Sequence, residues 1–319
     1  MAASSRQRPV ARYTPLVAGR WSLAPLLALL LAAMPMAAQE AQVPTFRSDV
    51  RLVNVFTGVD SEQTGKPVAD LSKNNFEVLE DGVPQKIAIF ERETVLPLSI
   101  VLAIDTSMST RTNLKLELLS AKKFADETVR PGTDKLALYT ISTGVDEVLP
   151  FTGDLKAIDR KIAEIKNGEA TALFDALYLG GEALKKQPGR RVLVLITDGG
   201  DTASQTSYQD ALRSALEAEA IVYSIIVVPI ESNAGRNTGG EHALIQASED
   251  TGGRYFYAKN IAQIEKAFAQ IAAELRTQYR LGYYPQKKYA DSDSRHIEVK
   301  LVGVAGRLTA HFRTVYFTH

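Results

Sequence analysis

LPLSIVLAIDTSMS, residues 96–109, is a short apolar run that ends in one carboxylate and three hydroxyl side chains. Runs of this length and composition are typical of strands buried on both faces of a parallel sheet. The segment RRVLVLITD, residues 190–198, has the same character. Both segments therefore predict central strands of an α/β sheet, and a polar loop follows each of them.

Predicted strands alternate with amphipathic helices throughout residues 95–277. KLALYTIS, AIVYSIIVV and RYFYA predict three further strands. Helices are expected at about 113–130, 154–166, 172–187, 205–220, 241–251 and 261–277. Asn260 is the expected N-cap of the last helix. The repeated order of strand and helix predicts a doubly wound, Rossmann-like and mostly parallel sheet.

Both ends of the chain instead show the alternating pattern of antiparallel strands. TFRSDVRLVNVF places Phe46, Val50 and Leu52 on one face. FEVLEDGVPQKIAIF predicts a hairpin around Asp81 and Gly82, with the two isoleucines on its second arm. QYRLGYYP, RHIEVKLVG and RLTAHFRTVYF predict strands near the C-terminus.

The expected organisation is one domain inserted into another. The predicted parts are a signal peptide at 1–38, a β segment at 39–94, the α/β domain at 95–277 and a second β segment at 278–319. Neither β segment is long enough for a convincing core of its own, so together they are expected to form a small discontinuous β-sandwich. The alternative is a pair of separate appendages on the α/β domain.

The leader consists of an apolar run, LAPLLALLLAAMPMAA, that follows four arginines. This arrangement is typical of a secretory signal peptide, with a cut expected after Ala38. The alternative is an uncleaved membrane anchor, which Pro25 and Pro35 disfavour because they interrupt a run already short for a spanning helix. Either reading predicts an extracytoplasmic protein that is periplasmic, secreted or at the cell surface.

Composition excludes several classes of function. The chain has 37 basic and 37 acidic residues, so nothing points to nucleic acid or an anionic membrane surface as a partner. It has no cysteine, which excludes a disulfide framework, a thiolate nucleophile and a zinc ribbon. Gly-x-Gly-x-x-Gly and Walker loops are absent, so no nucleotide is expected.

Oxygen-bearing side chains stand where loops follow the central strands or lead into a helix. The candidate ligands are Asp105, Ser107, Ser109, Thr171 and Asp198. In the common strand order 3-2-1-4-5-6, the strands that end at Asp105 and Asp198 are neighbours at the switch point, and Thr171 can approach the same crevice. Because oxygen ligands suit hard cations such as Mg²⁺, the pattern predicts a metal site rather than an acid–base pair.

IDTSMS, TALFDAL and ITDGGD together resemble the metal-ion-dependent adhesion site of von Willebrand factor type A (VWFA) domains, which also occur in integrins. All five positions of that motif are filled. The flanks resemble the bacterial VWFA-related family, whose F-x-V-x-E-D-G and Y-x-L-G-Y-x-P patterns read FEVLEDG at 76–82 and YRLGYYP at 279–285.

The resemblance implies a Mg²⁺ or Mn²⁺ ion held directly by Ser107 and Ser109. Thr171 would bind it directly or through water, and Asp105 and Asp198 would act mostly through water. Neutral hydroxyls leave such a cation under-neutralised, so an Asp or Glu side chain of a partner protein can complete its shell. The implied function is an exported, metal-dependent protein-binding or adhesion module.

The sequence departs from the family pattern at two places. Met108 stands between the serines where Gly is common, and Thr110-Arg111 follow the motif where integrin β chains carry acidic residues for a second cation. No second metal site is therefore expected. Asp175 and Asp201 are expected to cap or support the site.

An enzyme is not expected. The chain has four histidines, and none has zinc-protease spacing or lies near a nucleophile-elbow motif, so a hydrolase is the weaker alternative. A scaffold module of an envelope complex, with an idle metal site, is the main alternative. An adaptor subunit for a cytoplasmic ATPase is a further one, which the leader argues against.

Overall fold

The computed structural model describes residues 52–92, 95–108, 114–228, 238–286 and 294–318. The predicted leader, together with Phe46 and Val50, lies outside these residues. No helix in the described ranges combines the length and the apolar character needed to cross a membrane.

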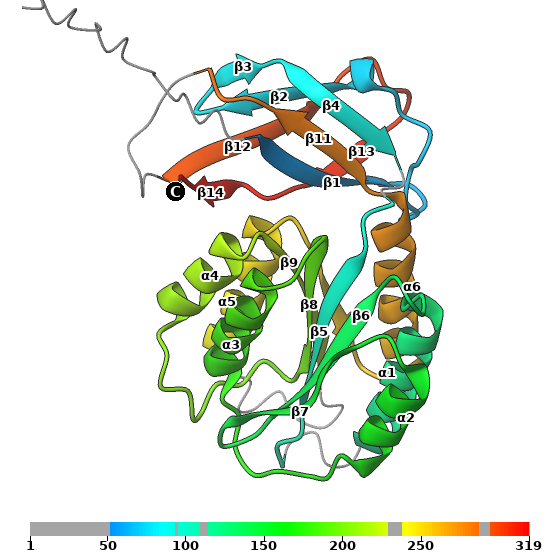
Figure 1. The fold of residues 1–319 in the computed structure, drawn as a ribbon, viewed down its shortest axis with the longest axis vertical. Coiled ribbons are helices and arrows are strands. Elements are labelled where there is room, and N and C mark those ends of the chain that lie inside the picture. Colours follow the sequence, from blue (N-terminus) through cyan, green and yellow to red (C-terminus); the bar gives the residue numbers. More distant parts are fainter. Residues whose placement is uncertain (1–51, 93–94, 109–113, 229–237, 287–293, 319) are drawn as a thin grey trace, which may run out of the picture. The chain divides into compact units, whose positions relative to one another are not determined.

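A six-stranded sheet forms the centre of the fold (Figure 1). Its strands are β5 (Leu98–Asp105), β6 (Lys135–Ile141), β7 (Val145–Thr152), β8 (Arg190–Thr197), β9 (Ala220–Val227) and β10 (Tyr255–Ala258). They follow the order β10-β9-β8-β5-β6-β7, and all pairings are parallel except that of β6 with β7. Numbered from β5, this is the predicted order 3-2-1-4-5-6, so the mostly parallel α/β sheet is confirmed.

Strand β7 has no counterpart among the strands predicted from the sequence. Its residues, VDEVLPFT, are all exposed or half-buried, and the strand lies at the edge of the sheet. A strand without a fully buried face shows neither a continuous apolar run nor a clean alternation, so the sequence carries no strong strand signal there.

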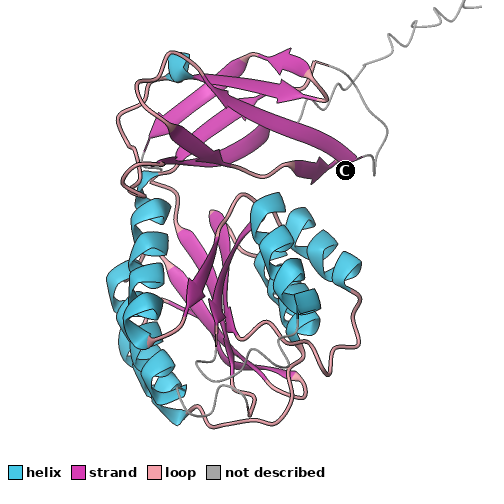
Figure 2. Ribbon diagram, turned by 180° about the vertical axis from the view of Figure 1, so that it is seen from behind, coloured by secondary structure: helices cyan, strands magenta, loops and turns pink. Residues whose placement is uncertain are grey.

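Helices cover both faces of the central sheet (Figure 2). In the described part of the chain they are α1 (Leu114–Thr128), α2 (Leu155–Glu164), α3 (Leu173–Lys185), α4 (Tyr208–Glu217), α5 (Thr238–Asp250) and α6 (Ile261–Thr277). Apolar residues of α1, α2 and α6 share one core with the sheet, and those of α3, α4 and α5 share a second. Strand β5 supplies both cores, because Ile100 and Leu102 face the first and Val101 and Ala103 face the second.

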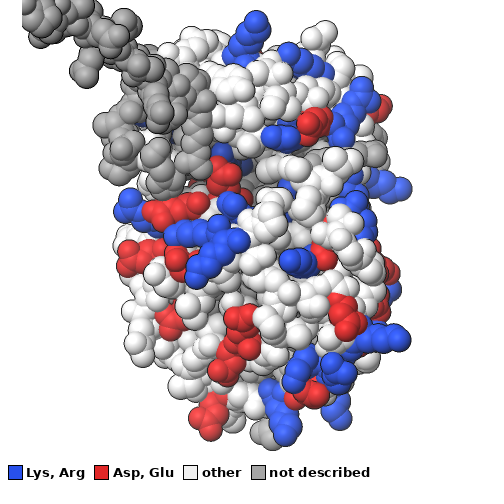
Figure 3. All heavy atoms as spheres, viewed as in Figure 1, with Lys and Arg blue, Asp and Glu red and all other residues white. Residues whose placement is uncertain are grey.

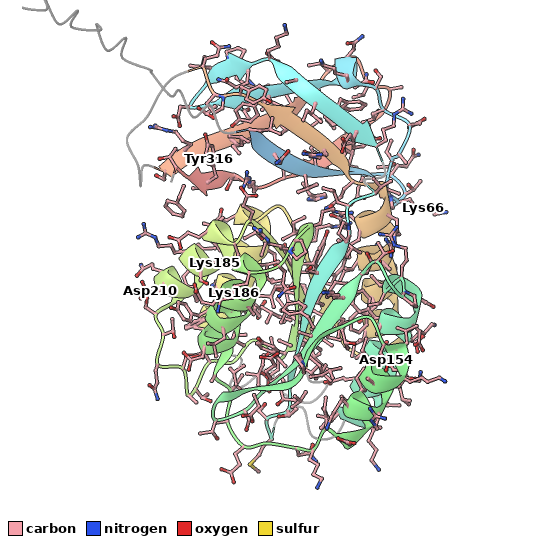
Figure 4. All side chains as sticks on the ribbon, in the orientation of Figure 1. Lys66, Asp154, Lys185, Lys186, Asp210 and Tyr316 are labelled. Atoms are coloured by element: carbon pink, nitrogen blue, oxygen red, sulfur yellow. The ribbon has the colours of Figure 1, made fainter. Side chains whose placement is uncertain are left out.

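Three of these helices, α2, α4 and α6, begin at side-chain caps that the sequence provides. Asn260 accepts a hydrogen bond from the backbone N–H of Gln263 at 3.1 Å, which confirms it as the N-cap of α6. Asp154 accepts from the N–H groups of Lys156 and Ala157 at 3.0 and 3.3 Å and begins α2 in the same way (Figure 4). Such caps satisfy N–H groups that have no partner inside the helix.

The flanking segments form two four-stranded antiparallel sheets. Their elements are β1 (Val53–Ser61), a 3₁₀ helix (Lys73–Asn75), β2 (Phe76–Glu80), β3 (Val83–Gln85), β4 (Ile87–Arg92), β11 (Tyr279–Tyr283), β12 (Ser294–Leu301), β13 (Leu308–His311) and β14 (Val315–Phe317). One sheet has the order β13-β1-β11-β4 and the other β14-β12-β2-β3. Both sheets contribute side chains to one buried cluster, so strands from the two ends of the chain share a core as predicted.

The predicted hairpin at Asp81 and Gly82 is present, but its second arm divides. Strand β2 pairs with β3 across the turn, where both residues have positive φ angles of 47° and 77°, as a tight hairpin turn requires. The following residues, Ile87–Arg92, leave this sheet and pair with β11 in the other one. The predicted strand RLTAHFRTVYF likewise divides into β13 and β14, in different sheets. Alternation identifies a strand but does not tell which sheet it joins.

Candidate functional site

The site begins where two neighbouring parallel strands end. The register pairs Ile104 of β5 with Ile196 of β8, so Asp105 and Thr197 come next on adjacent strands. The hydroxyl of Thr197 donates to Asp105 Oδ2 at 2.7 Å, and the backbone N–H of Ser107 donates to Oδ1 at 2.8 Å. Both oxygens of this buried carboxylate are therefore held in place at the carboxyl edge of the sheet.

Hydrogen bonds join the three segments that carry the candidate ligands. The backbone N–H of Gly168 donates to the carbonyl of Thr106 at 2.6 Å, which connects the β5 loop to the loop before α3. The N–H of Thr202 donates to the carbonyl of Thr171 at 2.8 Å, and the N–H of Thr171 donates to the hydroxyl of Thr202 at 3.0 Å. The loops after β5, before α3 and after β8 thus form one connected layer.

Glycine is required where the first two of these loops meet. A Cβ atom on Gly168 would lie 2.2 Å from the hydroxyl oxygen of Ser142 and 2.9 Å from that of Thr106. Both distances are far below van der Waals contact, so any other residue would push the loops apart. This close approach explains why glycine stands at position 168.

Four of the candidate ligands lie in this layer, and the fifth, Ser109, lies outside the described residues. Ser107 and Thr171 are buried, Asp105 is fully buried and Asp198 is partly exposed. Burial raises the pKa of Asp105; hydrogen bonds to Ser107 and Thr197 lower it, and the negative charge of Asp198 raises it. The two carboxylates therefore lie within electrostatic reach of each other.

Asp201 holds the layer to the start of α3. Its Oδ1 accepts hydrogen bonds from the N–H groups of Leu173 and Phe174 at 2.9 and 3.4 Å, which places a negative charge at the positive end of the helix. Asp175 lies within α3 and holds the loop that leads to α4. Its carboxylate accepts hydrogen bonds from the N–H groups of Gln205 and Thr206 in that loop. Asp201 thus caps α3, and Asp175 supports the loop that leads to α4.

Replacing Asp201 with alanine is expected to lower the free energy of unfolding by about 1 kcal/mol, because two N–H groups of α3 lose their acceptor. Cation affinity should also fall, by roughly tenfold, since Asp201 supports the loop that carries Thr171. Urea unfolding and calorimetric titration measure the two effects. Asp146→Ala, at an exposed position of β7, is the matched control. Wild-type stability and affinity in Asp201→Ala would contradict the prediction.

A third acidic residue beside the site was not identified from the sequence. Glu117 lies in the first turn of α1 and is 0% exposed. Among the described residues, neither of its carboxyl oxygens has a hydrogen-bond partner. Burial, and then the charges of Asp105 and Asp198, raise its pKa to about 8. Nothing in the local sequence LKLELL marks this glutamate as buried, so only the three-dimensional structure reveals it.

Carboxylates alone do not form a metal cage among the residues that the structure describes. Within the described ranges, no three His, Cys, Asp or Glu side chains come together in a way that could hold a metal ion. The predicted site differs from such cages because it combines two carboxylates with hydroxyl groups.

Part of the α/β domain also matches a known protein family in sequence. Residues 100–200 match the family model described as the von Willebrand factor type A domain. This range includes Asp105, Thr171 and Asp198. The sequence matches none of the curated proteins with which it was compared.

Several solved structures resemble this chain at low sequence identity. The conserved hypothetical protein BatB from Bacteroides thetaiotaomicron is 19% identical with a TM-score of 0.46, covering 56% of this chain and 98% of that one. A von Willebrand factor type A protein from Catenulispora acidiphila is 12% identical with a TM-score of 0.49, covering 86% and 76%. Proximal thread matrix protein 1 from the mussel byssus is 14% identical with a TM-score of 0.50, covering 62% and 51%.

At such identities, similarity to solved structures concerns the fold alone. The family match is more specific, because it spans the strands and loops that bring Asp105 and Asp198 together. Residues 100–200 are therefore similar to a von Willebrand factor type A domain, and they lie in a central sheet with the predicted strand order.

Proposed function

We propose that this chain is an exported protein-binding module that uses Mg²⁺ or Mn²⁺ to bind an acidic side chain of a partner protein. The observation that supports this most strongly is the connected layer of loops at the ends of β5 and β8. Three segments far apart in the sequence meet there, and each contributes an oxygen-bearing side chain of the adhesion motif. An arrangement of this kind suits a cation better than it suits an acid–base pair.

The donor set fits a hard divalent cation. Hydroxyl and carboxylate oxygens are the ligands that Mg²⁺ prefers, and the described candidate ligands include no nitrogen or sulfur donor that would favour zinc or copper. Ser107 and Thr171 would hold the cation through their hydroxyls, with Asp105 and Asp198 acting mostly through water. Ser109 belongs to this set on the sequence motif alone. When bound, the cation supplies a positive charge that an external carboxylate can approach.

The charged side chains on the protein surface bear on how an acidic partner would be attracted. Basic and acidic side chains are interspersed over the face drawn in Figure 3, and no broad basic patch stands out there. Formal charge over the whole chain is zero. An acidic partner would therefore find its main attraction in the bound cation rather than in a basic surface on that face.

The proposed location follows from the leader. Arginines followed by an apolar run support export from the cytoplasm, where Mg²⁺ bound at the domain surface would face partners in the periplasm or outside the cell. The partner is a protein that presents an aspartate or glutamate. Loop surfaces around the site would select it.

Water-proton relaxation of the Mn²⁺-loaded protein tests the proposal. A short peptide with one glutamate should lower the relaxation enhancement, because its carboxylate displaces water from the bound ion. The same peptide with glutamine in that place should leave the enhancement unchanged. Equal effects of the two peptides, or no effect of either, would contradict carboxylate binding. Failure to bind Mn²⁺ at all would favour the alternative of a scaffold module with an idle site.

A further inference from the structure

Glu117 is a buried acidic residue with no hydrogen-bond partner to explain it. Its side chain is 0% exposed, and both carboxyl oxygens lack a hydrogen-bond partner within the described residues. Most buried polar groups in native proteins are hydrogen-bonded, and exceptions commonly mark a function or the place of a water molecule or ion. A glutamate kept in such a position requires a reason.

The helix around Glu117 reverses the usual distribution of polar and apolar residues. Leu116 and Leu119 are exposed at 45% and 63%, while the glutamate between them faces the interior. Its helical neighbours on the inner face, Leu114 and Ala121, belong to the core of the domain. An amphipathic helix would place an apolar side chain at position 117. Local violations of this kind are expected at functional sites.

The surroundings of Glu117 connect it to the candidate metal site. The charges that act on its carboxyl group are those of Asp105 and Asp198, and both are negative. Three acidic groups therefore share one region at the carboxyl edge of the sheet. Asp105 is itself buried, so acidic groups are gathered where water screens their mutual repulsion poorly. A divalent cation at the site would compensate all three.

We propose that Glu117 is a further acidic residue of the cation site, which holds the cation through water rather than as a direct ligand. In the described part of the chain no three acidic side chains come close enough to hold a metal together, so Asp105, Asp198 and Glu117 do not form a shared cage of direct ligands. Glu117 is thus a positioning residue whose charge raises affinity for the cation. This inference rests on the proposed function, because it places the cation beside Asp105 and Asp198.

Two replacements of Glu117 separate its charge from its volume. Glu117→Gln keeps the shape, and Glu117→Met also removes the polar atoms that lack partners. Outer residues of metal sites typically contribute about 10- to 100-fold in affinity, so both variants should bind Mg²⁺ and Mn²⁺ at least tenfold more weakly. In the absence of metal, Glu117→Met should melt at the wild-type temperature or above it, because an uncompensated buried carboxyl group has been removed.

Calorimetric titration of the purified protein with Mg²⁺ and Mn²⁺, together with thermal melting in EDTA, gives both quantities. Glu127→Gln, on the exposed side of the same helix, is the matched control and should behave as the wild type. Weaker metal binding without loss of metal-free stability is the expected result. A role in packing alone would instead lower the melting temperature and leave affinity unchanged.

The outcomes distinguish this inference from the proposed function. If the wild type binds metal and both Glu117 variants bind it within twofold of the same affinity, the role of Glu117 is overturned and the proposed function stands. If the wild type shows no saturable binding of either cation, both proposals are overturned.

Discussion

Asp105→Ala is expected to abolish saturable binding of Mg²⁺ and Mn²⁺, with a loss of affinity of at least about 100-fold. Asp105 is the most buried carboxylate of the candidate site, and it joins β5 to β8 through the hydroxyl of Thr197 at 2.7 Å. Alanine removes both the negative charge and the acceptor that fixes the backbone of Ser107. Titration calorimetry of the wild type and the variant measures the effect.

Asp105→Asn separates charge from loop geometry. Asparagine keeps an oxygen that can accept from the Ser107 N–H, so the loop should remain ordered while the charge is lost. Its affinity should therefore fall almost as far as that of the alanine variant. Asp126→Ala is the control, because Asp126 lies on the exposed side of α1. Saturable binding by Asp105→Ala at close to wild-type affinity would show that the cation binds elsewhere.

Asp134→Asn is expected to lower the free energy of unfolding by about 3 kcal/mol, because it weakens a cluster of charge-assisted hydrogen bonds. Asp134 is buried after the end of α1. The Arg130 side chain donates to both of its oxygens at 2.8 and 2.9 Å, Arg276 of α6 donates at 3.2 Å, and the N–H of Leu98 donates at 2.8 Å. One carboxylate thus connects α1, α6 and the start of the central strand.

The same cluster predicts a dependence of stability on pH. Burial raises the pKa of Asp134, but hydrogen bonds from Arg130, Leu98 and Arg276 outweigh that effect and bring the pKa to about 2. Because the folded-state pKa lies below the value of 3.8 for the unbonded group, the stabilisation is complete above about pH 4 and is lost as the pH falls through 2. A shift of this size corresponds to about 2 kcal/mol.

Urea unfolding of the wild type and Asp134→Asn between pH 7 and pH 2 checks both statements. The difference in stability between them should be largest at neutral pH and should shrink below pH 4. Asp126→Asn is the control, since its ion pair with Lys122 is exposed and worth little. A difference that stays constant down to pH 2 would show that the charge of Asp134 does not cause the effect.

The sequence allowed the central fold to be predicted because its signals there are strong. Buried parallel strands appear as apolar runs, and Asn260 marks the start of α6 with a cap that the structure confirms. The position of Asp105 beside the strand that leads to Asp198 followed from the common strand order alone. One flanking strand was placed less well: β4 joins the other sheet, because alternation leaves the choice of sheet partner open.

The residues that surround and stabilise the candidate site could be predicted only in part from the sequence. Asp201 could be suspected because it lies close to Asp198 in the chain, whereas Glu117 and Asp134 show no comparable sign. Asp134 follows Pro-Gly-Thr and looks like an ordinary turn residue, and Glu117 looks like a polar position of an amphipathic helix. Their environments depend on contacts between distant elements, which a periodic pattern cannot encode.

Anomalous diffraction from crystals soaked in Mn²⁺ is the most direct test of the central claim, that this domain holds a divalent cation at the ends of β5 and β8. We expect one strong peak bounded by Asp105, Ser107, Thr171 and Asp198, with Glu117 on its inner side. We also expect the peak to disappear in Asp105→Ala. A peak at another place, or none at a saturating concentration of Mn²⁺, would contradict a cation site at the ends of β5 and β8.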